Sequence, residues 1–329
     1  MRTTRIGLVA ACLGALAVTP PAAAAQGAAA DYPTRPVRWV VPFAPGASND
    51  ITARLLAQKL SETMGQQFVV DNRPGAGGSI GAALVAEATP DGHTLLHANP
   101  GPSVNNVLLR KRSPYPMEAF APVVFIGYVP LIIVATPSLP ANNIKEFVAY
   151  AKANPGKVTW ATSGLGSSLH IGLALFQAAT GADVVHVPYK GTAPALLDIV
   201  PGRVHVMYTT TVSADTHIKS GRVKVLAVAG PARQAVQPNV PTLAESGVKN
   251  AEATVWFGVQ VPAKTPQAVI TKLNAEINKT LKMPDVKQRL DQLGLVVTGG
   301  SPQDFAAFMK TEAERLQMLI RTKRIDMIE

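Results

Sequence analysis

The stretch that decides the fold covers residues 37–54 and reads VRWVVPFAPGASNDITAR. Its apolar beginning, residues 37–42, predicts a buried strand, and the Pro, Gly and small residues at 43–49 predict a turn. An amphipathic helix is expected from about Asp50. A turn from the carboxyl end of a strand into a helix directs free backbone N–H groups and the positive end of the helix dipole at one point. The stretch therefore predicts an anion-binding turn.

Two further turns have a similar build, residues 162–168 (TSGLGSS) and 189–194 (YKGTAP). We expect the three turns to face one another across a cleft and to hold a small carboxylate. Removing water from a carboxylate costs several kcal/mol and each charge-assisted hydrogen bond recovers about 1.5–3 kcal/mol, so about three to five donors are needed. Neither main turn contains Arg or Lys. The expected donors are backbone N–H groups and the hydroxyls of Ser163, Ser167, Ser168 and Thr192.

Composition indicates a packed protein of two α/β domains. The chain has 329 residues, 47% of them hydrophobic and 16% charged, which argues against disorder. The net charge is +10, but the basic residues are dispersed. The two basic clusters, residues 110–112 and 321–324, are not interleaved with aromatic residues as in single-strand nucleic-acid platforms. We expect no nucleic-acid partner, and a positive field that steers anions inward.

The first 25 residues have the pattern of a cleaved secretory signal. Arg2 and Arg5 form a charged start, residues 6–18 an apolar run, and residues 23–25 an A-x-A cleavage site. The run is shorter than the about 20 apolar residues that span a bilayer. The protein is therefore expected in the periplasm and not as a membrane-spanning chain.

Cys12 is the only cysteine and lies inside this leader. Cleavage near residue 25 leaves a chain without disulfides, thiol catalysis or Cys-based zinc sites. Residues 9–12 also resemble a lipoprotein box, which would leave a lipidated Cys12. Because the apolar run continues past this cysteine, cleavage there would cut the run in its middle.

Strands and helices alternate along the rest of the chain. Further strands are expected at residues 68–70, 94–98, 123–136 (divided at Pro130), 158–161, 184–187, 204–208, 223–229, 255–261 and 295–298. Helices are expected at residues 50–64, 80–88, from Asn143 with a capping box to Glu146, 168–180, 194–200, 215–220, 266–281 and 302–320. This order predicts parallel sheets with ligand sites at the carboxyl ends of strands.

The sequence resembles the Bug family, periplasmic solute receptors associated with tripartite tricarboxylate transporters. The resemblance rests on residues 42–57 (PFAPGASNDITARLLA), 71–81 (DNRPGAGGSIG), 150–170 (YAKANPGKVTWATSGLGSSLH) and 186–198 (HVPYKGTAPALLD). Residues 241–247 (PTLAESG) and 256–266 (WFGVQVPAKTP) add to it. These motifs cover essentially the whole chain after the leader.

The resemblance implies an α/β, two-lobed periplasmic-binding-protein fold, each lobe a mostly parallel sheet flanked by helices, with the ligand cleft between the lobes. The chain would cross near residues 127–131 and 251–255. Lobe one would then comprise residues 32–128 plus 254–329, and lobe two residues 129–253. The implied function is capture of a small organic acid, without enzymatic activity, cofactor or metal, for delivery to integral-membrane transporter subunits.

In the family, the turn after the first strand and the turn before the helix at Ser168 act as pincers on a ligand carboxylate, and the third turn closes the site. The ligand-binding residues that this implies are Phe43, Gly46, Ala47, Ser48, Asn49, Ser163, Gly164, Gly166, Ser167, Ser168, Tyr189, Gly191, Thr192, Ala193 and Thr209.

Two departures from the family pattern bear on the ligand. The first pincer has Gly46-Ala47 where the family usually has two glycines, which narrows the pocket. Residues 209–211 are all Thr, where relatives often carry an acidic or amide residue; this weakens the case for an amino acid, whose ammonium group needs a carboxylate partner. Asp50 is a possible partner, or it supports the helix N-terminus.

Other motifs leave two alternative functions. Residues 77–81 match the G-x-S-x-G of a hydrolase nucleophile elbow, but residues 72–76 separate them from the preceding strand. A secreted serine hydrolase using Ser79 or Ser168 with His170 or His186 is one alternative, and a ligand-sensing co-receptor in signalling is the other. The glycines of this loop also resemble a dinucleotide loop, without the acidic residue that would hold a ribose.

Overall fold

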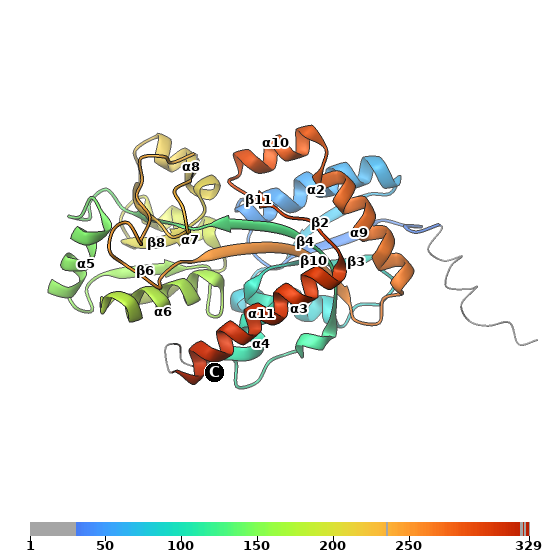
Figure 1. Ribbon diagram of the computed structural model, residues 1–329, viewed down its shortest axis with the longest axis horizontal. Helices are drawn as coiled ribbons and strands as arrows, with labels where there is room; N and C mark the ends of the chain where they lie inside the picture. The colour runs from blue at the N-terminus through green and yellow to red at the C-terminus, as the bar shows by residue number, and fades with distance from the viewer. Residues whose placement is uncertain (1–30, 235, 323–324, 326, 329) are drawn as a thin grey trace, which may run out of the picture.

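Two β-sheets with helices on both faces form the two lobes of the protein (Figure 1). The computed structural model describes residues 31–234, 236–322, 325 and 327–328, and the expected signal peptide lies outside these residues. Within the described part of the chain, no helix is both long and apolar enough to cross a bilayer.

The first lobe contains a six-stranded sheet in the order β11-β4-β10-β3-β1-β2. Its strands are β1 (Val37–Val41), β2 (Phe68–Asn72), β3 (Thr94–Ala98), β4 (Phe120–Pro130), β10 (Thr254–Pro262) and β11 (Val296–Val297). Its helices are α2 (Ser48–Met64), α3 (Ser79–Ala86), α4 (Asn106–Leu109), α9 (Gln267–Leu281), α10 (Pro284–Gln292) and α11 (Pro302–Arg321). The apolar faces of α2 and α9 share one core cluster, whereas α11 contributes Phe305 and Met309 to a separate cluster.

The second lobe contains a five-stranded sheet in the order β7-β6-β8-β5-β9. Its strands are β5 (Ile132–Ala135), β6 (Thr159–Thr162), β7 (Val185–Pro188), β8 (Val206–Thr209) and β9 (Lys224–Val228). Its helices are α5 (Ile144–Ala153), α6 (Ser168–Thr180), α7 (Thr192–Ile199) and α8 (Thr211–Lys219). In Figure 1, α5 and α6 lie on one side of the sheet, α7 and α8 on the other. Trp160 on β6 packs between Phe147, Phe176 and Tyr208 at the centre of this core.

Both sheets are mixed, whereas the sequence predicts mostly parallel sheets. Strands β1, β2 and β3 are parallel, as are β6, β7 and β8, but β4, β10, β5 and β9 run antiparallel to their neighbours. In the first sheet, β4 and β10 form one long antiparallel pair, from Phe120 opposite Pro262 to Pro130 opposite Thr254. In the second sheet, β5 pairs antiparallel with both β8 and β9. The pair of β4 and β10 carries the chain out of the first lobe and back into it (Figure 1).

Most predicted elements are present, with boundaries that shift by at most four residues. The predicted N-cap of α5 is confirmed, because Asn143 Oδ1 accepts a hydrogen bond from the N–H of Glu146 at 3.0 Å. The reciprocal bond of a capping box is displaced by one residue, because Glu146 accepts from the N–H of Asn142. Helix α8 begins at Thr211 instead of residue 215, which moves its N-terminus to the end of β8. Among the α-helices of the described residues, α10 and α4 were not predicted, and neither were the short helical turns over residues 76–78, 101–105 and 117–119.

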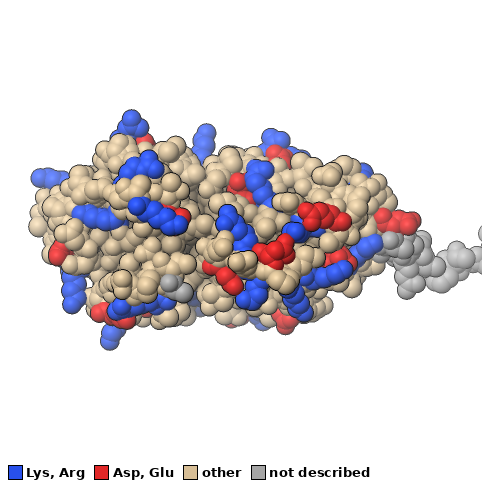
Figure 2. All heavy atoms as spheres, turned by 90° about the horizontal axis from the view of Figure 1, so that it is seen from above, with Lys and Arg blue, Asp and Glu red and all other residues tan. Residues whose placement is uncertain are grey.

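Charged side chains are scattered over the face seen in Figure 2. Lys and Arg occur over both lobes and alternate with Asp and Glu, most closely on the first lobe. Ion pairs at the surface of the first lobe, such as Lys287–Asp291 at 3.0 Å, combine the two signs. This face therefore has the mixed character of a solvated surface.

Candidate ligand-binding site

Four helices begin at one cleft between the lobes: α2 at Ser48, α6 at Ser168, α7 at Thr192 and α8 at Thr211. The cleft encloses about 430 Å³ of space not filled by atoms, part of it open to solvent. The residues that line it are Phe43, Ala47, Ser48, Asn49, Asn99, Leu131, Ser163, Ser167, Ser168, Leu169, Thr192, Thr210, Val255 and Phe257. The first turns of these helices contain N–H groups that have no partner within the helix.

Asp50 supports the turn between β1 and α2. Its Oδ2 accepts a hydrogen bond from the N–H of Gly46 at 3.0 Å, and Gly46 has a φ of +89° that disfavours other residues. The guanidinium of Arg54 donates to the same carboxylate at 3.0 Å, and the amide of Asn72 donates to it at 3.0 Å. Burial by itself raises the pKa of Asp50, but these hydrogen bonds outweigh it and hold the pKa below its usual value. The Asp50 carboxylate is therefore ionised and, as an anion, stabilises the turn.

Two histidines support the second turn. The N–H of Gly166 donates to Nδ1 of His170 at 3.2 Å, and the His170 ring stacks on His186 with 4.7 Å between ring centroids. His186 Nε2 in turn lies 2.6 Å from the hydroxyl of Thr162. Burial, together with the neighbouring His186, lowers the pKa of His170 to about 4. The ring that accepts from Gly166 is therefore neutral at pH 7.

Hydrogen bonds across the cleft hold the two lobes together. The N–H of Ser48 in the first lobe donates to Oγ of Ser213 in the second at 3.1 Å. Ser213 is held by Thr210, the N-cap of α8, through a hydroxyl contact of 2.8 Å. The N–H of Ala44 also donates to the carbonyl of Lys190 at 3.3 Å. The turns at the two sides of the cleft are thus in direct contact.

Charge in the cleft comes from the backbone and not from side chains. Among the residues that the structure describes, those that line the cleft include Ser, Thr, Asn and apolar side chains but no Asp, Glu, Lys, Arg or His. Each helix N-terminus is equivalent to roughly +0.5 elementary charge. Four such ends at one cleft favour an anionic group that can accept several N–H and O–H hydrogen bonds. The described residues contain no cluster suited to hold a metal ion.

Eight of the fifteen expected site residues line the cleft: Phe43, Ala47, Ser48, Asn49, Ser163, Ser167, Ser168 and Thr192. The other seven, Gly46, Gly164, Gly166, Tyr189, Gly191, Ala193 and Thr209, are not part of the lining. Tyr189 donates its hydroxyl to Asp198 at 2.7 Å.

Three of these glycines lie where the lobes meet. A Cβ on Gly166 would collide with Oδ1 of Asn106, and one on Gly191 would lie 3.2 Å from Ala44, both in the first lobe. A Cβ on Gly164 would lie 3.1 Å from the backbone N of Gly77, also in the first lobe. These glycines therefore permit close approach of the lobes.

Six lining residues were not predicted: Asn99, Leu131, Leu169, Thr210, Val255 and Phe257. Asn99 directly follows β3, so the rule that sites lie at strand carboxyl ends could have found it. Thr210 was missed because α8 was expected to begin four residues later. The remaining residues are apolar and carry no signal that distinguishes a cleft wall from a core.

The two histidines of the hydrolase alternative are hydrogen-bonded to groups other than a serine, and the Ser79 hydroxyl is buried without a hydrogen-bond partner among the described residues. Ser79 lies in the first turn of α3 and is 4% exposed. Nδ1 of His170 contacts the N–H of Gly166, and Nε2 of His186 contacts the hydroxyl of Thr162. Neither contact is to a serine. The arrangement thus lacks the nucleophile–base contact that such chemistry requires.

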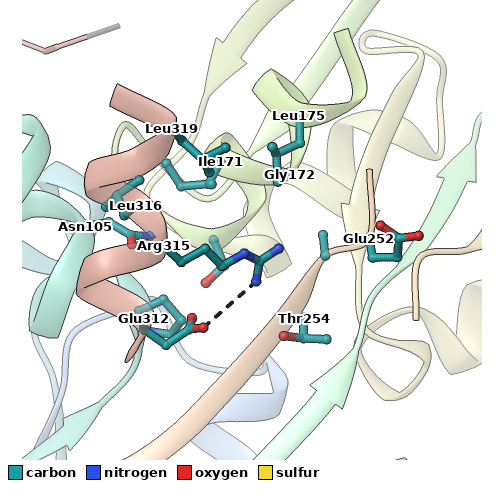
Figure 3. A pocket seen from close by; sticks show the side chains of 13 residues that line it. Asn105, Ile171, Gly172, Leu175, Glu252, Thr254, Glu312, Arg315, Leu316 and Leu319 are labelled. Atoms are coloured by element: carbon teal, nitrogen blue, oxygen red, sulfur yellow. Dashed lines mark ion pairs between the residues drawn. The ribbon is translucent and has the colours of Figure 1, made fainter. Parts of the chain in front are cut away.

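A second pocket lies between α6 and α11 and adjoins the cleft at Ser168, which lines both (Figure 3). It contains Arg315, whose guanidinium points into the pocket and lies 3.9 Å from the carboxylate of Glu312. Glu252 also lines it, and so one cation is set against two carboxylates. Ile171 and Leu316 contribute apolar wall. This charge balance suits a carboxylate less well than the cleft does.

The chain is similar to known proteins over most of its length. A family model described as tripartite tricarboxylate transporter family receptor matches residues 52–325. Protein BugT of Bordetella pertussis is 37% identical over 300 residues, which cover 91% of this chain and 92% of BugT.

Two solved structures are similar in both sequence and fold. R. palustris Rpa4515 with adipate is 36% identical, with a TM-score of 0.85 over 88% of this chain and 98% of that one. MatC from Rhodopseudomonas palustris with bound malate is 33% identical, with a TM-score of 0.83 over 86% of this chain and 98% of that one.

Proposed function

The chain belongs to the tripartite tricarboxylate transporter receptor family, and on that premise we propose that it captures a small carboxylate-bearing metabolite between its lobes and delivers it to a transporter of that type. The observation that carries the proposal is the convergence of four helix N-termini on one cleft. Backbone donors there compensate for the water that a carboxylate loses. The adipate and malate bound to the two similar structures, both carboxylates, support this ligand class.

Binding is coupled to closure in this proposal. We infer that lobe one comprises residues 32–128 plus 254–329 and lobe two residues 129–253, with the hinge where the chain crosses. Separate core clusters in the two sheets support this division. A ligand that contacts turns from both lobes favours the closed form, since those contacts exist only when the lobes meet. The transporter would then distinguish the loaded receptor by its closed shape.

The sequence pattern of residues 1–25 supports export. We propose that residues 1–25 are removed during secretion and that the receptor acts in the periplasm, as expected for this family. Mass spectrometry of the protein purified from the periplasm of the native host tests this. The mature chain is expected to begin near Gln26. A cytoplasmic chain that retains residues 1–25 would contradict export.

A ligand screen tests the binding function. Thermal-shift measurements with monocarboxylates, dicarboxylates, tricarboxylates and aromatic acids are followed by calorimetry on each compound that stabilises the protein. At least one carboxylate is expected to bind with a micromolar dissociation constant, which corresponds to about 8 kcal/mol. Stabilisation only by compounds without a carboxylate would overturn the proposal.

The variant Ser168→Pro tests the backbone donors directly. Proline is tolerated at the first position of a helix and removes the N–H there. The preceding Ser167 has φ −68° and ψ 163°, which suits a residue before proline. Carboxylate affinity is expected to fall roughly tenfold or more, since a charge-assisted hydrogen bond contributes about 1.5–3 kcal/mol.

Two controls accompany this variant. Ser168→Ala removes the hydroxyl but keeps the N–H, so it separates the two donors. Gln267→Pro makes the same change at the first position of α9, which lies outside the cleft lining, and is expected to leave affinity unchanged. Equal affinity of Ser168→Pro and Ser168→Ala would contradict a backbone donor at this position.

A further inference from the structure

We propose that the cleft selects against ligands that carry an ammonium group, so that its ligand is a carboxylate with a neutral body and not an amino acid. This inference rests on the proposed function, because it concerns the same cleft. It specifies what the remainder of the ligand can be, beyond the carboxylate that the helix N-termini attract.

The first argument is that the cleft offers no anionic partner. None of the lining residues within the described ranges is Asp or Glu. Thr210, which directly follows β8 and lines the cleft, carries no charge, and its hydroxyl contacts Ser213. An ammonium group buried without a carboxylate loses its hydration without the ionic partner that would compensate for it.

The second argument concerns the carboxylate of Asp50. This residue follows the lining residues Ser48 and Asn49 in the sequence. It is 4% exposed, and three groups already donate hydrogen bonds to it: the N–H of Gly46, Arg54 and Asn72. Arg54 also neutralises its charge, with an ion pair of 3.0 Å. The Asp50 carboxylate therefore stabilises the turn. A ligand ammonium group could pair with Asp50 only if these hydrogen bonds broke, which would disrupt the same turn that binds the ligand carboxylate.

The third argument is electrostatic. The partial positive charges of the four helix N-termini that attract a carboxylate repel an ammonium group held in the same cleft. The side-chain oxygens of Asn49 and Asn99 already accept from the backbone N–H groups of Asp50 and Gly101, so each retains at most one lone pair for a ligand.

The remaining walls are apolar. Five side chains contribute them, and they come from both lobes and from the crossing strands: Phe43, Leu131, Leu169, Val255 and Phe257. Burial of an aliphatic or aromatic body against these walls stabilises the complex, whereas the same burial disfavours a second charge of positive sign.

Matched pairs of acids that differ only by an ammonium group test the inference. Calorimetry at pH 7 compares succinate with aspartate, glutarate with glutamate, adipate with 2-aminoadipate, and 3-phenylpropionate with phenylalanine. In every pair with a measurable ligand, the acid without nitrogen is expected to bind roughly 100-fold tighter or more. The reason is that the amino acid would bury an ammonium group without an ionic partner. An amino acid that binds as tightly as its partner overturns the inference but leaves the proposed function intact. If no acid of any pair or of the wider screen binds, the proposed function itself fails.

The variant Thr210→Asp adds the missing carboxylate, and Thr210→Asn is its neutral counterpart. Asp and Asn are both favourable N-cap residues, so α8 keeps its cap in either variant. The affinity ratio within a pair is expected to shift toward the amino acid at least tenfold in Thr210→Asp relative to Thr210→Asn. Any effect of the altered shape is common to both variants and cancels. Equal ratios in the two folded variants would contradict the electrostatic argument, and the pairs measured on the unaltered protein test the inference independently.

Discussion

Ser48 and Ser213 are joined across the cleft by a hydrogen bond of 3.1 Å, from the backbone N–H of Ser48 to the hydroxyl of Ser213. The two residues belong to different lobes and to the first turns of two helices, α2 and α8. A bond of this kind exists only when the lobes are closed. It therefore links the turn that we propose binds a carboxylate to the conformation of the whole molecule.

Replacement of Ser213 by Ala is expected to favour the open form. A neutral hydrogen bond contributes about 0.5–1.5 kcal/mol, which predicts a roughly two- to tenfold loss of ligand affinity through the closing equilibrium. Small-angle X-ray scattering of the free protein would report the opening, and calorimetry the affinity. Ser220→Ala is the control, since Ser220 follows the same helix but bonds only to its own turn and to Arg222. Identical scattering and affinity for the two variants would argue against the cross-cleft bond.

Glycine is expected to be required at position 77 for closure. Gly77 has φ +63° and Gly65 has φ +71°, so an alanine is similarly strained at either position. A Cβ on Gly77 would collide with the carbonyl oxygen of Leu165 in the opposite lobe, whereas nothing lies within 4 Å of a Cβ on Gly65. Gly77→Ala is therefore expected to lose more than tenfold in ligand affinity, and Gly65→Ala to retain it, at similar unfolding temperatures. Retained affinity in Gly77→Ala would show that the lobes need not approach this closely.

Removal of the charge of Asp50 is expected to reduce stability above acidic pH. The pKa of Asp50 is lower in the folded protein than its ordinary 3.8, because hydrogen bonds from Arg54 and others outweigh the effect of burial. The stabilisation is therefore complete above about pH 4 and is lost as the pH falls through the lower folded value. Asp50→Asn is expected to be less stable by roughly 1.5–3 kcal/mol at pH 7, with a smaller difference below pH 4. Urea unfolding over this range measures it, and a difference that does not depend on pH would contradict the ionic role.

Protonation of His170 is expected to weaken the second turn. Its pKa is lowered from 6.5 to about 4 by burial and by His186, so the unfolded chain binds more protons between these values. The unfolding free energy therefore decreases as the pH falls from 6.5 toward 4. His170→Asn keeps an acceptor for the N–H of Gly166 but does not titrate, and a smaller slope is expected. Equal slopes for the two proteins would show that His170 does not contribute to this pH dependence.

The sequence predicts the fold class and most of the elements because they follow from local patterns. Alternating apolar runs and Gly- or Pro-containing turns locate the strands, and the Asn143–Glu146 pair locates a helix start that the structure confirms. The mixed direction of the sheets could not be read in the same way. In the first sheet it depends on the pairing of β4 (residues 120–130) with β10 (residues 254–262). These strands are far apart in the sequence, and no local pattern indicates that they pair.

The sequence predicts the residues of the candidate site that lie in turns at helix starts. It predicts the apolar residues that form the cleft walls less well. Ser48, Ser168 and Thr192 lie at helix starts that Gly, Ser and Thr mark in the sequence. Leu131 and Phe257 line the cleft only because the lobes meet there, and an apolar residue looks the same in a core as in a cleft wall. The glycines of the second turn, which are expected at the ligand, also lie where the lobes approach each other, and their small size permits that approach.

A crystal structure of the protein with the tightest-binding acid of the screen tests the central claim most directly. The ligand carboxylate is expected in the cleft, with its oxygens about 2.7–3.2 Å from backbone N–H groups in the first turns of α2 and α6. A carboxylate bound to the guanidinium of Arg315 in the second pocket, or held at any other place mainly by Lys or Arg side chains, would contradict it.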